Sequence, residues 1–426
     1  MKRNLNDVIV IGFALFAMFF GAGNVIFPPY LGLQAGKLWT LGFIFYFIAD
    51  VGLAILAILA MIRHGSAEAV LESAGKIPGI ILMTISVLCV GPMPAIPRTA
   101  ATTYEMSILP LFPNIPPFIF SIIFFAIIIL LCLQESAVID IIGKFLTPGL
   151  LIGLLVLIIE GIVNPIGSIS DKAFVDNVPI EGIRAGYQTM DVIAALVFGA
   201  IILSSAKEKG YTDAKKKSQI IAQSSIIAGI GLLIVYGGLT FLGANTGGLY
   251  NLDIDRATLV VNIVQNLLGK SGIIIFAIVV GLACLTTAIG LVSSAADYFH
   301  KLSNEKISYR MLVILICICS AIFANFGLSF IISIAAPLLD IIYPPILVLV
   351  LIAFVPENIV KSCYISQFAT LGAFIYNFLS TLDNYIGLRF DILSKFPFAS
   401  IDLGWILPTI FGGIIGLIIK KDIKAN

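Results

Sequence analysis

The feature that most constrains the fold of this chain is a series of apolar runs, each long enough to cross a bilayer as a helix. The run from Phe118 to Leu133 contains no charged residue, and a spanning helix needs about 20 apolar residues. Charged residues make up only 12% of the chain, against about 25% in soluble proteins, so a water-soluble fold is excluded. Continuous runs also exclude a transmembrane β-barrel, whose strands alternate in polarity. The sequence therefore predicts an all-α polytopic membrane protein.

The apolar runs predict about twelve transmembrane helices in a single transmembrane domain covering residues 1–426. We place them at 8–31, 38–62, 77–104, 117–133, 138–163, 187–205, 218–243, 271–298, 309–325, 327–354, 364–382 and 403–419. The longest segments between them, 164–186 and 244–270, are too short to build a soluble domain. Within the second of these, Ala257 to Leu268 is expected to form a short amphipathic helix.

Basic residues predict the orientation. Of the 25 Lys and Arg residues, 17 fall on the side of the predicted bundle that holds both termini. Because cytoplasmic loops are enriched in Lys and Arg, both termini are predicted to be cytoplasmic and the protein to lie in the cell membrane. The start, Lys2-Arg3 before an apolar run, is typical of a signal peptide, but no clear cleavage site follows. We interpret it as a retained first helix.

Residues that disfavour a regular helix interrupt the first span. Gly21-Ala22-Gly23-Asn24 is followed by Pro28-Pro29; glycine permits non-helical dihedral angles, and proline removes a hydrogen-bond donor. Unpaired backbone groups are costly in lipid, so a break persists only where protein or ligand satisfies them. Broken helices near the membrane midplane commonly hold the substrate of secondary transporters. A proline kink or close helix packing is the alternative.

Two further spans contain irregular segments. In the sixth, Leu196-Val197-Phe198-Gly199 is a candidate second break, because spans one and six would then open two halves of five helices each. In the third, three prolines within Gly91 to Ala100 precede the intramembrane Arg98. A charge inside a membrane suggests a functional site, although a structural ion pair of Arg98 with Glu105 or Asp191 explains it equally well.

Two acidic residues within the spans, Asp50 and Asp191, are candidates for proton relay or gating, as is Arg98 for gating. The eighth span offers oxygen ligands on one helix face: the carbonyl of Ala283 and the hydroxyls of Thr286 and Thr287. Such ligands suit a hard monovalent cation beside a broken helix. The alternative is that the hydroxyls bond back to their own helix.

Other functional classes find less support. An intramembrane enzyme would need convergent catalytic groups within the spans, whereas His64 and His300 are predicted in loops, so no enzymatic activity is expected. A channel would need a repeated pore motif, and none is present. The six cysteines form no CxxC pair, and the net charge of +1 gives no basic field for nucleic acid. We expect contacts with membrane lipids, no nucleic acid and no obligate protein partner.

At these motifs the chain resembles the bacterial branched-chain amino acid:cation symporters of the amino acid–polyamine–organocation superfamily. Residues 20–29, Phe-Gly-Ala-Gly-Asn-Val-Ile-Phe-Pro-Pro, are similar to the signature of that family. Gly91 to Ala100 and Thr189 to Gly199 are similar to two further blocks. The resemblance implies import of leucine, isoleucine and valine coupled to Na⁺ or, alternatively, to H⁺, with no organic cofactor. An exporter or exchanger on the same fold is the alternative class.

The resemblance also implies the leucine-transporter (LeuT-like) fold, a five-plus-five inverted repeat with broken helices 1 and 6. The halves would be 8–163 and 187–354, with helices 11 and 12 at 364–419. In the first break, the amides of Gly21, Ala22 and Gly23 would receive the substrate carboxylate. In the second, carbonyls near Ala195, Leu196 and Phe198 would receive the ammonium group, and Phe198 with Phe20 would line the side-chain pocket. Asn24 and Gly199 complete the implied substrate-binding residues. The implied sodium ligands are the carbonyls of Ala17, Phe20 and Ala283 and the hydroxyls of Thr286 and Thr287.

One departure bears on the stoichiometry. Relatives with a second sodium use a hydroxyl on helix six, and the segment Ile193 to Ala200 contains none. We therefore expect one cation per amino acid.

Overall fold

The computed structural model describes residues 2–133, 137–388, 390 and 392–420. Within this part of the chain the regular structure is helical, without a named β-strand. The α-helices are α1 (Lys2–Phe19), α2 (Ala22–Ala35), α3 (Trp39–Phe47), α4 (Leu53–His64), α5 (Ala67–Leu71), α6 (Lys76–Val90), α7 (Ala95–Thr103), α8 (Pro117–Leu133), α9 (Ala137–Val163), α10 (Val178–Thr189), α11 (Asp191–Glu208), α12 (Ala214–Ala244), α13 (Arg256–Leu302), α14 (Tyr309–Ala324), α15 (Leu328–Ile352), α16 (Glu357–Ser362), α17 (Ile365–Ile386) and α18 (Ile406–Ile418).

Each predicted span coincides with helical structure. The span at 117–133 has the bounds of α8, and the predicted amphipathic segment is the first part of α13, which kinks at Gly269 (φ 65°) before the apolar part begins. The sixth span differs, because its helical structure starts at Val178 rather than 187. Among the described residues, five continuous helical segments are long and apolar enough to cross a membrane by themselves: Ala22–His64, Lys76–Ile108, Lys215–Ala244, Arg256–Leu302 and Leu328–Ile352. The number of twelve spans stays a prediction.

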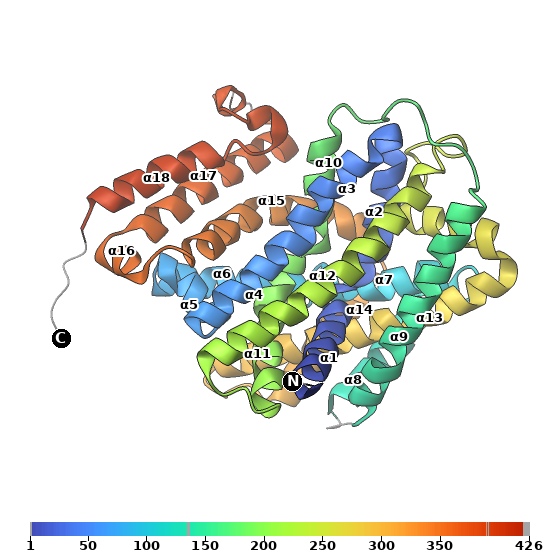
Figure 1. Ribbon diagram of the computed structural model, residues 1–426, viewed down its shortest axis with the longest axis horizontal. Helices are drawn as coiled ribbons and strands as arrows, with labels where there is room; N and C mark the ends of the chain where they lie inside the picture. The colour runs from blue at the N-terminus through green and yellow to red at the C-terminus, as the bar shows by residue number, and fades with distance from the viewer. Residues whose placement is uncertain (1, 134–136, 389, 391, 421–426) are drawn as a thin grey trace.

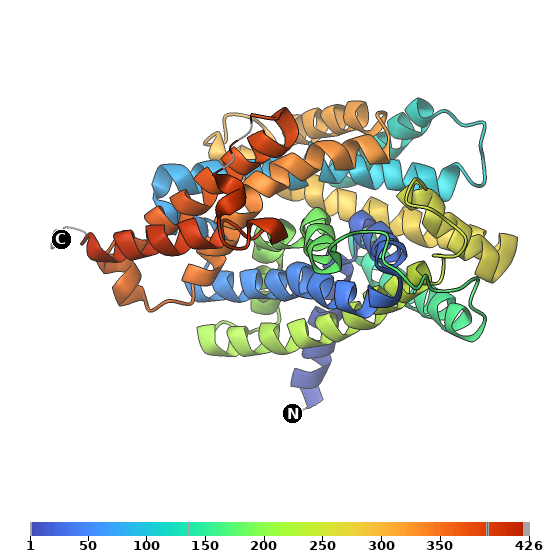
Figure 2. The same ribbon diagram turned by 90° about the horizontal axis from the view of Figure 1, so that it is seen from above.

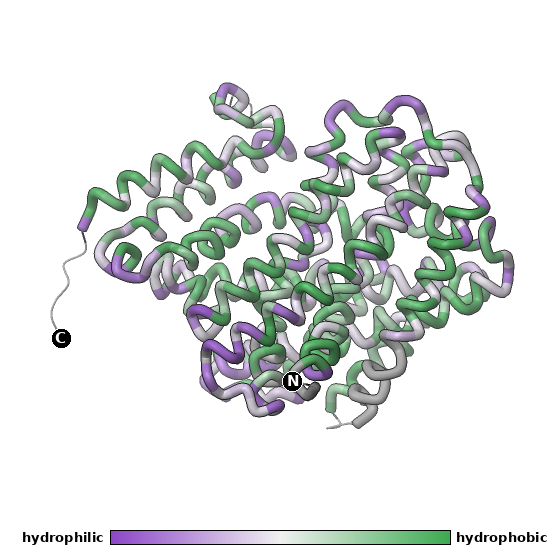
Figure 3. Tube along the Cα trace, viewed as in Figure 1, coloured by the Kyte–Doolittle hydropathy of each residue, from purple (hydrophilic) through white to green (hydrophobic). Residues whose placement is uncertain are grey.

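The helices form one bundle, with α17 and α18 packed against each other along one side (Figures 1 and 2). At its centre α1 and α2 pack on α12, and α10 packs on α3. Apolar residues also cover much of the outside (Figure 3). On α8 and α18, large apolar side chains such as Phe118, Ile122 and Phe411 are exposed, and such surfaces suit contact with lipid chains.

Helices α2 and α12 approach so closely that their backbones touch. A Cβ atom added to Gly32 would overlap the carbonyl oxygen of Thr240, and one added to Gly243 would overlap the carbonyl oxygen of Pro29. Small residues permit such contact between membrane helices, where packing replaces the hydrophobic effect as the cause of association. This contact fixes the position of α2, which carries one half of the candidate site.

Candidate functional site

The first span breaks where the sequence predicts a break. Helix α1 ends at Phe19 and α2 begins at Ala22, with Gly21 extended between them (φ −112°, ψ −172°). The Gly21 amide donates to the carbonyl oxygen of Phe19 (3.0 Å) and to Oδ1 of Asn24 (3.3 Å), rather than to the carbonyl of Ala17 as in a continuing helix. Asn24 thus caps the new helix. Pro28 and Pro29 do not break the span, since both lie inside α2.

The predicted break at Leu196 to Gly199 is wrong. These residues lie inside the continuous helix α11, and the sixth span instead breaks at Met190, between α10 and α11. Met190 has a left-handed backbone (φ 70°, ψ 16°), which is uncommon for a residue with a side chain. The small size of Gly199 has a packing reason, because a Cβ atom there would overlap the Met61 side chain of α4.

Arg98 stabilises this second break. The third span is interrupted as predicted, since α6 ends at Val90 and α7 begins at Ala95. From α7, Arg98 donates through Nη1 to the carbonyl oxygen of Gln188 (2.5 Å) and through Nη2 to that of Thr189 (3.0 Å). These carbonyls end α10, where the helix supplies no donors and its dipole is negative.

Neither ion pair considered for Arg98 is formed within 4 Å in the described part of the chain. Glu105 instead accepts a hydrogen bond from the Leu328 amide (2.9 Å), which begins α15. The Arg98 guanidinium also lies against Gly23: a Cβ atom there would be 2.9 Å from Nη2. The second glycine of the first break is therefore needed for the approach of Arg98.

A buried polar network connects the two breaks. The Nδ2 atom of Asn24 donates to Oδ2 of Asp50 (3.3 Å) and Oδ2 of Asp191 (3.1 Å). The hydroxyl of Thr189 donates to Oδ1 of Asp50 (2.8 Å). Asp50 lies in a π-helical segment, Ile48–Gly52, a distortion that is frequent at functional sites. Both aspartates were predicted from the sequence as site residues, whereas Thr189 was not; its one signal is its place two residues before Asp191, at the start of the segment Thr189 to Gly199.

A small central cavity of about 30 Å³ lies at the meeting point of the two breaks. This volume accommodates a water molecule or two, and not an amino acid. Its lining residues come from seven helices and both breaks: Met18, Phe19, Gly21, Ala22, Asn24, Val90, Ala95, Arg98, Thr99, Thr189, Met190, Asp191, Ala194, Phe198, Thr287 and Leu291. In this conformation the centre of the bundle is closed.

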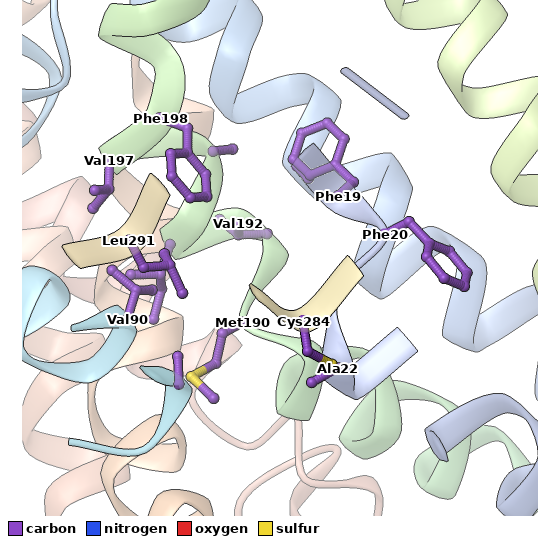
Figure 4. Packing of buried hydrophobic residues seen from close by; sticks show 14 of the residues in the cluster. Phe19, Phe20, Ala22, Val90, Met190, Val192, Val197, Phe198, Cys284 and Leu291 are labelled. Atoms are coloured by element: carbon purple, nitrogen blue, oxygen red, sulfur yellow. The ribbon is translucent and has the colours of Figure 1, made fainter. Parts of the chain in front are cut away.

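The cavity contains only part of the predicted substrate site. Among the implied residues, Gly21, Ala22, Asn24 and Phe198 line it, whereas Phe20, Gly23, Ala195, Leu196 and Gly199 do not. The Phe20 ring stacks on Phe16 and Tyr236. Figure 4 shows this ring turned away from the apolar group that Phe198 forms with Val90, Met190 and Leu291. Phe19, rather than Phe20, contributes to the cavity.

The predicted ion ligands lie beside the first break. A Cβ atom on Gly21 would be 3.7 Å from Cγ2 of Thr287, which places α13 against the broken segment. Thr287 lines the cavity. The Thr286 hydroxyl donates to the Ala283 carbonyl oxygen at 2.9 Å, which is the alternative bonding mode considered above. Because a hydroxyl oxygen has two lone pairs, the Thr286 oxygen can still coordinate a cation while its hydrogen is donated to Ala283.

A second cavity, of about 300 Å³, approaches the centre from one surface of the bundle. Glu68, Glu72 and Lys301 lie among its lining residues, as do Val87 and Val197. Val87 precedes the central-cavity residue Val90 by one helical turn, and Val197 immediately precedes Phe198. The side chains of about one helical turn therefore lie between this cavity and the central cavity.

Comparisons with known proteins agree over nearly the whole chain. A family model described as "Branched-chain amino acid transport protein" matches residues 4–423. The branched-chain amino acid permease BrnQ of Escherichia coli (strain K12) is 36% identical over 423 residues, covering 97% of this chain and 95% of the relative. The permease BraB of Bacillus subtilis (strain 168) is 34% identical over 448 residues, covering 100% and 98%.

Solved structures agree in fold. Mhp1, a nucleobase-cation-symport-1 family transporter solved in a closed conformation with bromovinylhydantoin, has a TM-score of 0.66 at 13% identity, covering 96% of this chain and 91% of its own. MhsT in complex with L-phenylalanine has a TM-score of 0.57 at 16% identity, covering 96% and 97%. The all-α, LeuT-like transporter fold is therefore confirmed, and the five-plus-five inverted repeat stays a prediction. Similarity at this sequence identity supports the fold alone.

Proposed function

Because the chain belongs to the branched-chain amino acid transport protein family, we propose that it imports leucine, isoleucine and valine across the cell membrane by symport with Na⁺. The observation that carries the proposal is the meeting of two helix breaks, at Gly21 and Met190, around one buried cavity. In this arrangement a zwitterion is held by backbone and short polar groups, so few formal charges are needed.

The start of α2 supports binding of the substrate carboxylate. The amides of Ala22 and Gly23 stand at the first positions of the helix, where the helix supplies no acceptor and its dipole favours an anion. The Gly21 amide already donates to the side chain of Asn24, so we assign the substrate carboxylate to the next two amides, those of Ala22 and Gly23. For these groups to meet a substrate, the closed centre has to widen.

The apolar side of the cavity supports selection of branched aliphatic side chains. Phe198, Val90 and Leu291 form this wall. An apolar pocket discriminates one methylene by only about 1–3 kcal/mol, so leucine, isoleucine and valine should all be accepted. A polar or charged side chain would lose its hydration without compensation.

The sodium site that we propose lies between the first break and α13, with the carbonyls of Ala17, Phe20 and Ala283 and the hydroxyls of Thr286 and Thr287. The position of Thr287 beside Gly21 supports it. Because no hydroxyl occurs from Ile193 to Ala200, we propose one cation per amino acid; two sodium ions per leucine in a flux measurement would contradict this.

Thr287→Ala is expected to raise the Na⁺ concentration for half-maximal uptake by roughly tenfold, the usual loss for one bond to a charged group. Thr287→Ser keeps the hydroxyl and is the matched control. Thr286→Ala should have a smaller effect, because that hydroxyl is engaged with the Ala283 carbonyl. An unchanged sodium dependence in both alanine variants would show that neither threonine is a ligand of the coupling ion.

Alternating access would connect the centre to each side in turn, as spans one, two, six and seven rock against a scaffold of spans three, four, eight and nine. With both termini in the cytoplasm, as the basic residues predict, the cavity that ends at Val87 and Val197 would open inward. The described conformation would then be closed at the substrate and partly open to the cytoplasm. Arg98, Asp50 and Asp191 couple the breaks in this scheme, and the two aspartates would carry the proton if H⁺ replaces Na⁺.

The deciding experiment is uptake of labelled isoleucine into proteoliposomes, with sodium and proton gradients imposed separately. Accumulation that requires an inward Na⁺ gradient is the expected result. Accumulation driven only by an H⁺ gradient would identify H⁺, rather than Na⁺, as the coupling ion. An exporter or exchanger would instead show no accumulation under either gradient but would release or exchange preloaded isoleucine. That outcome would contradict the proposed direction of transport.

A further inference from the structure

Because the sixth span breaks at Met190 and not at Leu196 to Gly199, the acceptors predicted for the substrate ammonium group are not released from the helix. The carbonyls near Ala195, Leu196 and Phe198 lie inside α11, which runs from Asp191 to Glu208. In the interior of an α-helix each carbonyl accepts the amide four residues later. These carbonyls therefore have their partners within the helix and do not face the centre as released groups.

The carbonyls at the actual break are also engaged. Those of Gln188 and Thr189, which end α10, accept hydrogen bonds from the guanidinium of Arg98 at 2.5 Å and 3.0 Å. An ammonium group placed there would lie against a fixed positive charge, and the two cations would repel each other. The second break thus offers no favourable backbone acceptor at its α10 side.

Among the residues that line the cavity, the charged acceptor is the carboxylate of Asp191. It lines the cavity together with Gly21 and Ala22 of the first break, and the residue is only 5% exposed. Its Oδ2 atom accepts one hydrogen bond, from Asn24 at 3.1 Å. No Lys or Arg nitrogen lies within 4 Å of it in the described ranges, and a carboxylate has capacity for about four donors.

Charge balance favours the same position. Asp50 and Asp191 both accept a hydrogen bond from Asn24, and Arg98 is the basic residue among those that line the cavity. Two ionised carboxylates and one guanidinium would leave the centre one positive charge short. An unpaired buried charge is strongly unfavourable, so either a proton shared by the carboxyls or the ammonium group of a ligand supplies that charge. Asp191 lies in the first turn of α11, where the helix dipole favours a negative side chain.

We propose that the Asp191 carboxylate binds the α-ammonium group of the transported amino acid. This inference rests on the proposed function and assigns a single side chain to a contact that backbone carbonyls would otherwise make. The substrate would then lie with its carboxylate toward the amides of Ala22 and Gly23, its ammonium on Asp191 and its side chain toward Phe198.

The test compares leucine with its 2-hydroxy acid analogue, 2-hydroxy-4-methylpentanoate, in binding to purified full-length protein by calorimetry in saturating Na⁺. The native protein should prefer leucine by about 10- to 100-fold, the range expected for a charge-assisted bond. In Asp191→Asn this preference should fall to within about threefold. Asp340→Asn is the control, since Asp340 is a half-buried carboxyl of α15 that lines a separate cavity and bonds to Tyr385, and it should keep the preference.

A general disturbance of the network would weaken leucine and the analogue alike, so an unchanged preference in Asp191→Asn would overturn the inference. An equal loss of preference in Asp340→Asn would overturn it as well. A changed sodium dependence with an unchanged preference would make Asp191 an ion ligand instead. Should Asp191→Asn fail to fold, Asp191→Ser replaces it under the same outcomes. If the native protein binds leucine neither with nor without Na⁺, the proposed function itself fails.

Discussion

Replacing Arg98 with glutamine is expected to abolish uptake and to lower the stability of the folded protein. The guanidinium bonds to the Gln188 and Thr189 carbonyls, and each buried group left unsatisfied costs about 1–3 kcal/mol. Glutamine is shorter and neutral, so the substitution also removes the positive charge nearest to the two aspartates. Removing one partner of a buried charge network commonly costs about 3–5 kcal/mol.

Thermal unfolding in detergent and isoleucine uptake measure the two effects. Arg98→Lys keeps the charge but lacks the planar fork that reaches two carbonyls, so it should fall between the native protein and the glutamine variant. Arg63→Gln is the matched control: Arg63 also donates to a carbonyl, that of Phe354 at 3.1 Å, but at an exposed position. Native uptake by Arg98→Gln would mean that Arg98 does not maintain the break of the sixth span.

The second large effect is expected for Gly243→Ala on α12. The added methyl group would overlap the Pro29 carbonyl oxygen, which belongs to the backbone of α2, so the helices would have to separate. Overpacking of a well-packed interior usually costs about 1–3 kcal/mol, and a rigid backbone neighbour leaves little room for relief. We expect a severe loss of folded protein, and the same for Gly32→Ala, whose methyl group would overlap the Thr240 carbonyl oxygen.

Yield of monodisperse protein in size-exclusion chromatography measures this effect. Gly229→Ala, on the same helix, is the control, because its Cβ atom would meet only the Ile55 side chain at an ordinary 3.5 Å. It should leave yield and uptake unchanged. Equal damage by Gly229→Ala, or native behaviour of Gly243→Ala, would contradict the role of the close contact between α2 and α12.

The first break could be predicted from sequence because its cause is local. Gly21 is extended between α1 and α2. Asn24, three residues later, accepts a hydrogen bond from the Gly21 amide, which replaces the bond that a continuous helix would make. The same locality explains why the interruption of the third span between Val90 and Ala95 is confirmed. The first depends on glycine and a short polar side chain, and the second on glycine and proline, within a few residues of each other.

The second break was misplaced because its cause is remote. Met190 gives no local sign of a left-handed backbone, and the bonds that satisfy the end of α10 come from Arg98, about 90 residues earlier in the chain. Gly199, which suggested a break, instead makes room for Met61 of α4. Neither relation can be read from spacing along one helix, so the acceptors assigned to the ammonium group were displaced with the break.

By itself the sequence determined that this chain is a bundle of membrane helices with a break in the first, because hydropathy and helix-breaking residues act over one or two turns. Only the tertiary structure decided where the sixth span opens, which residues line the centre, and that Asn24 connects Asp50 to Asp191. Buried polar groups need hydrogen-bond partners, and the tertiary fold determines which groups lie close enough to provide them. Those partners lie on other helices, at distances along the chain that no local pattern encodes.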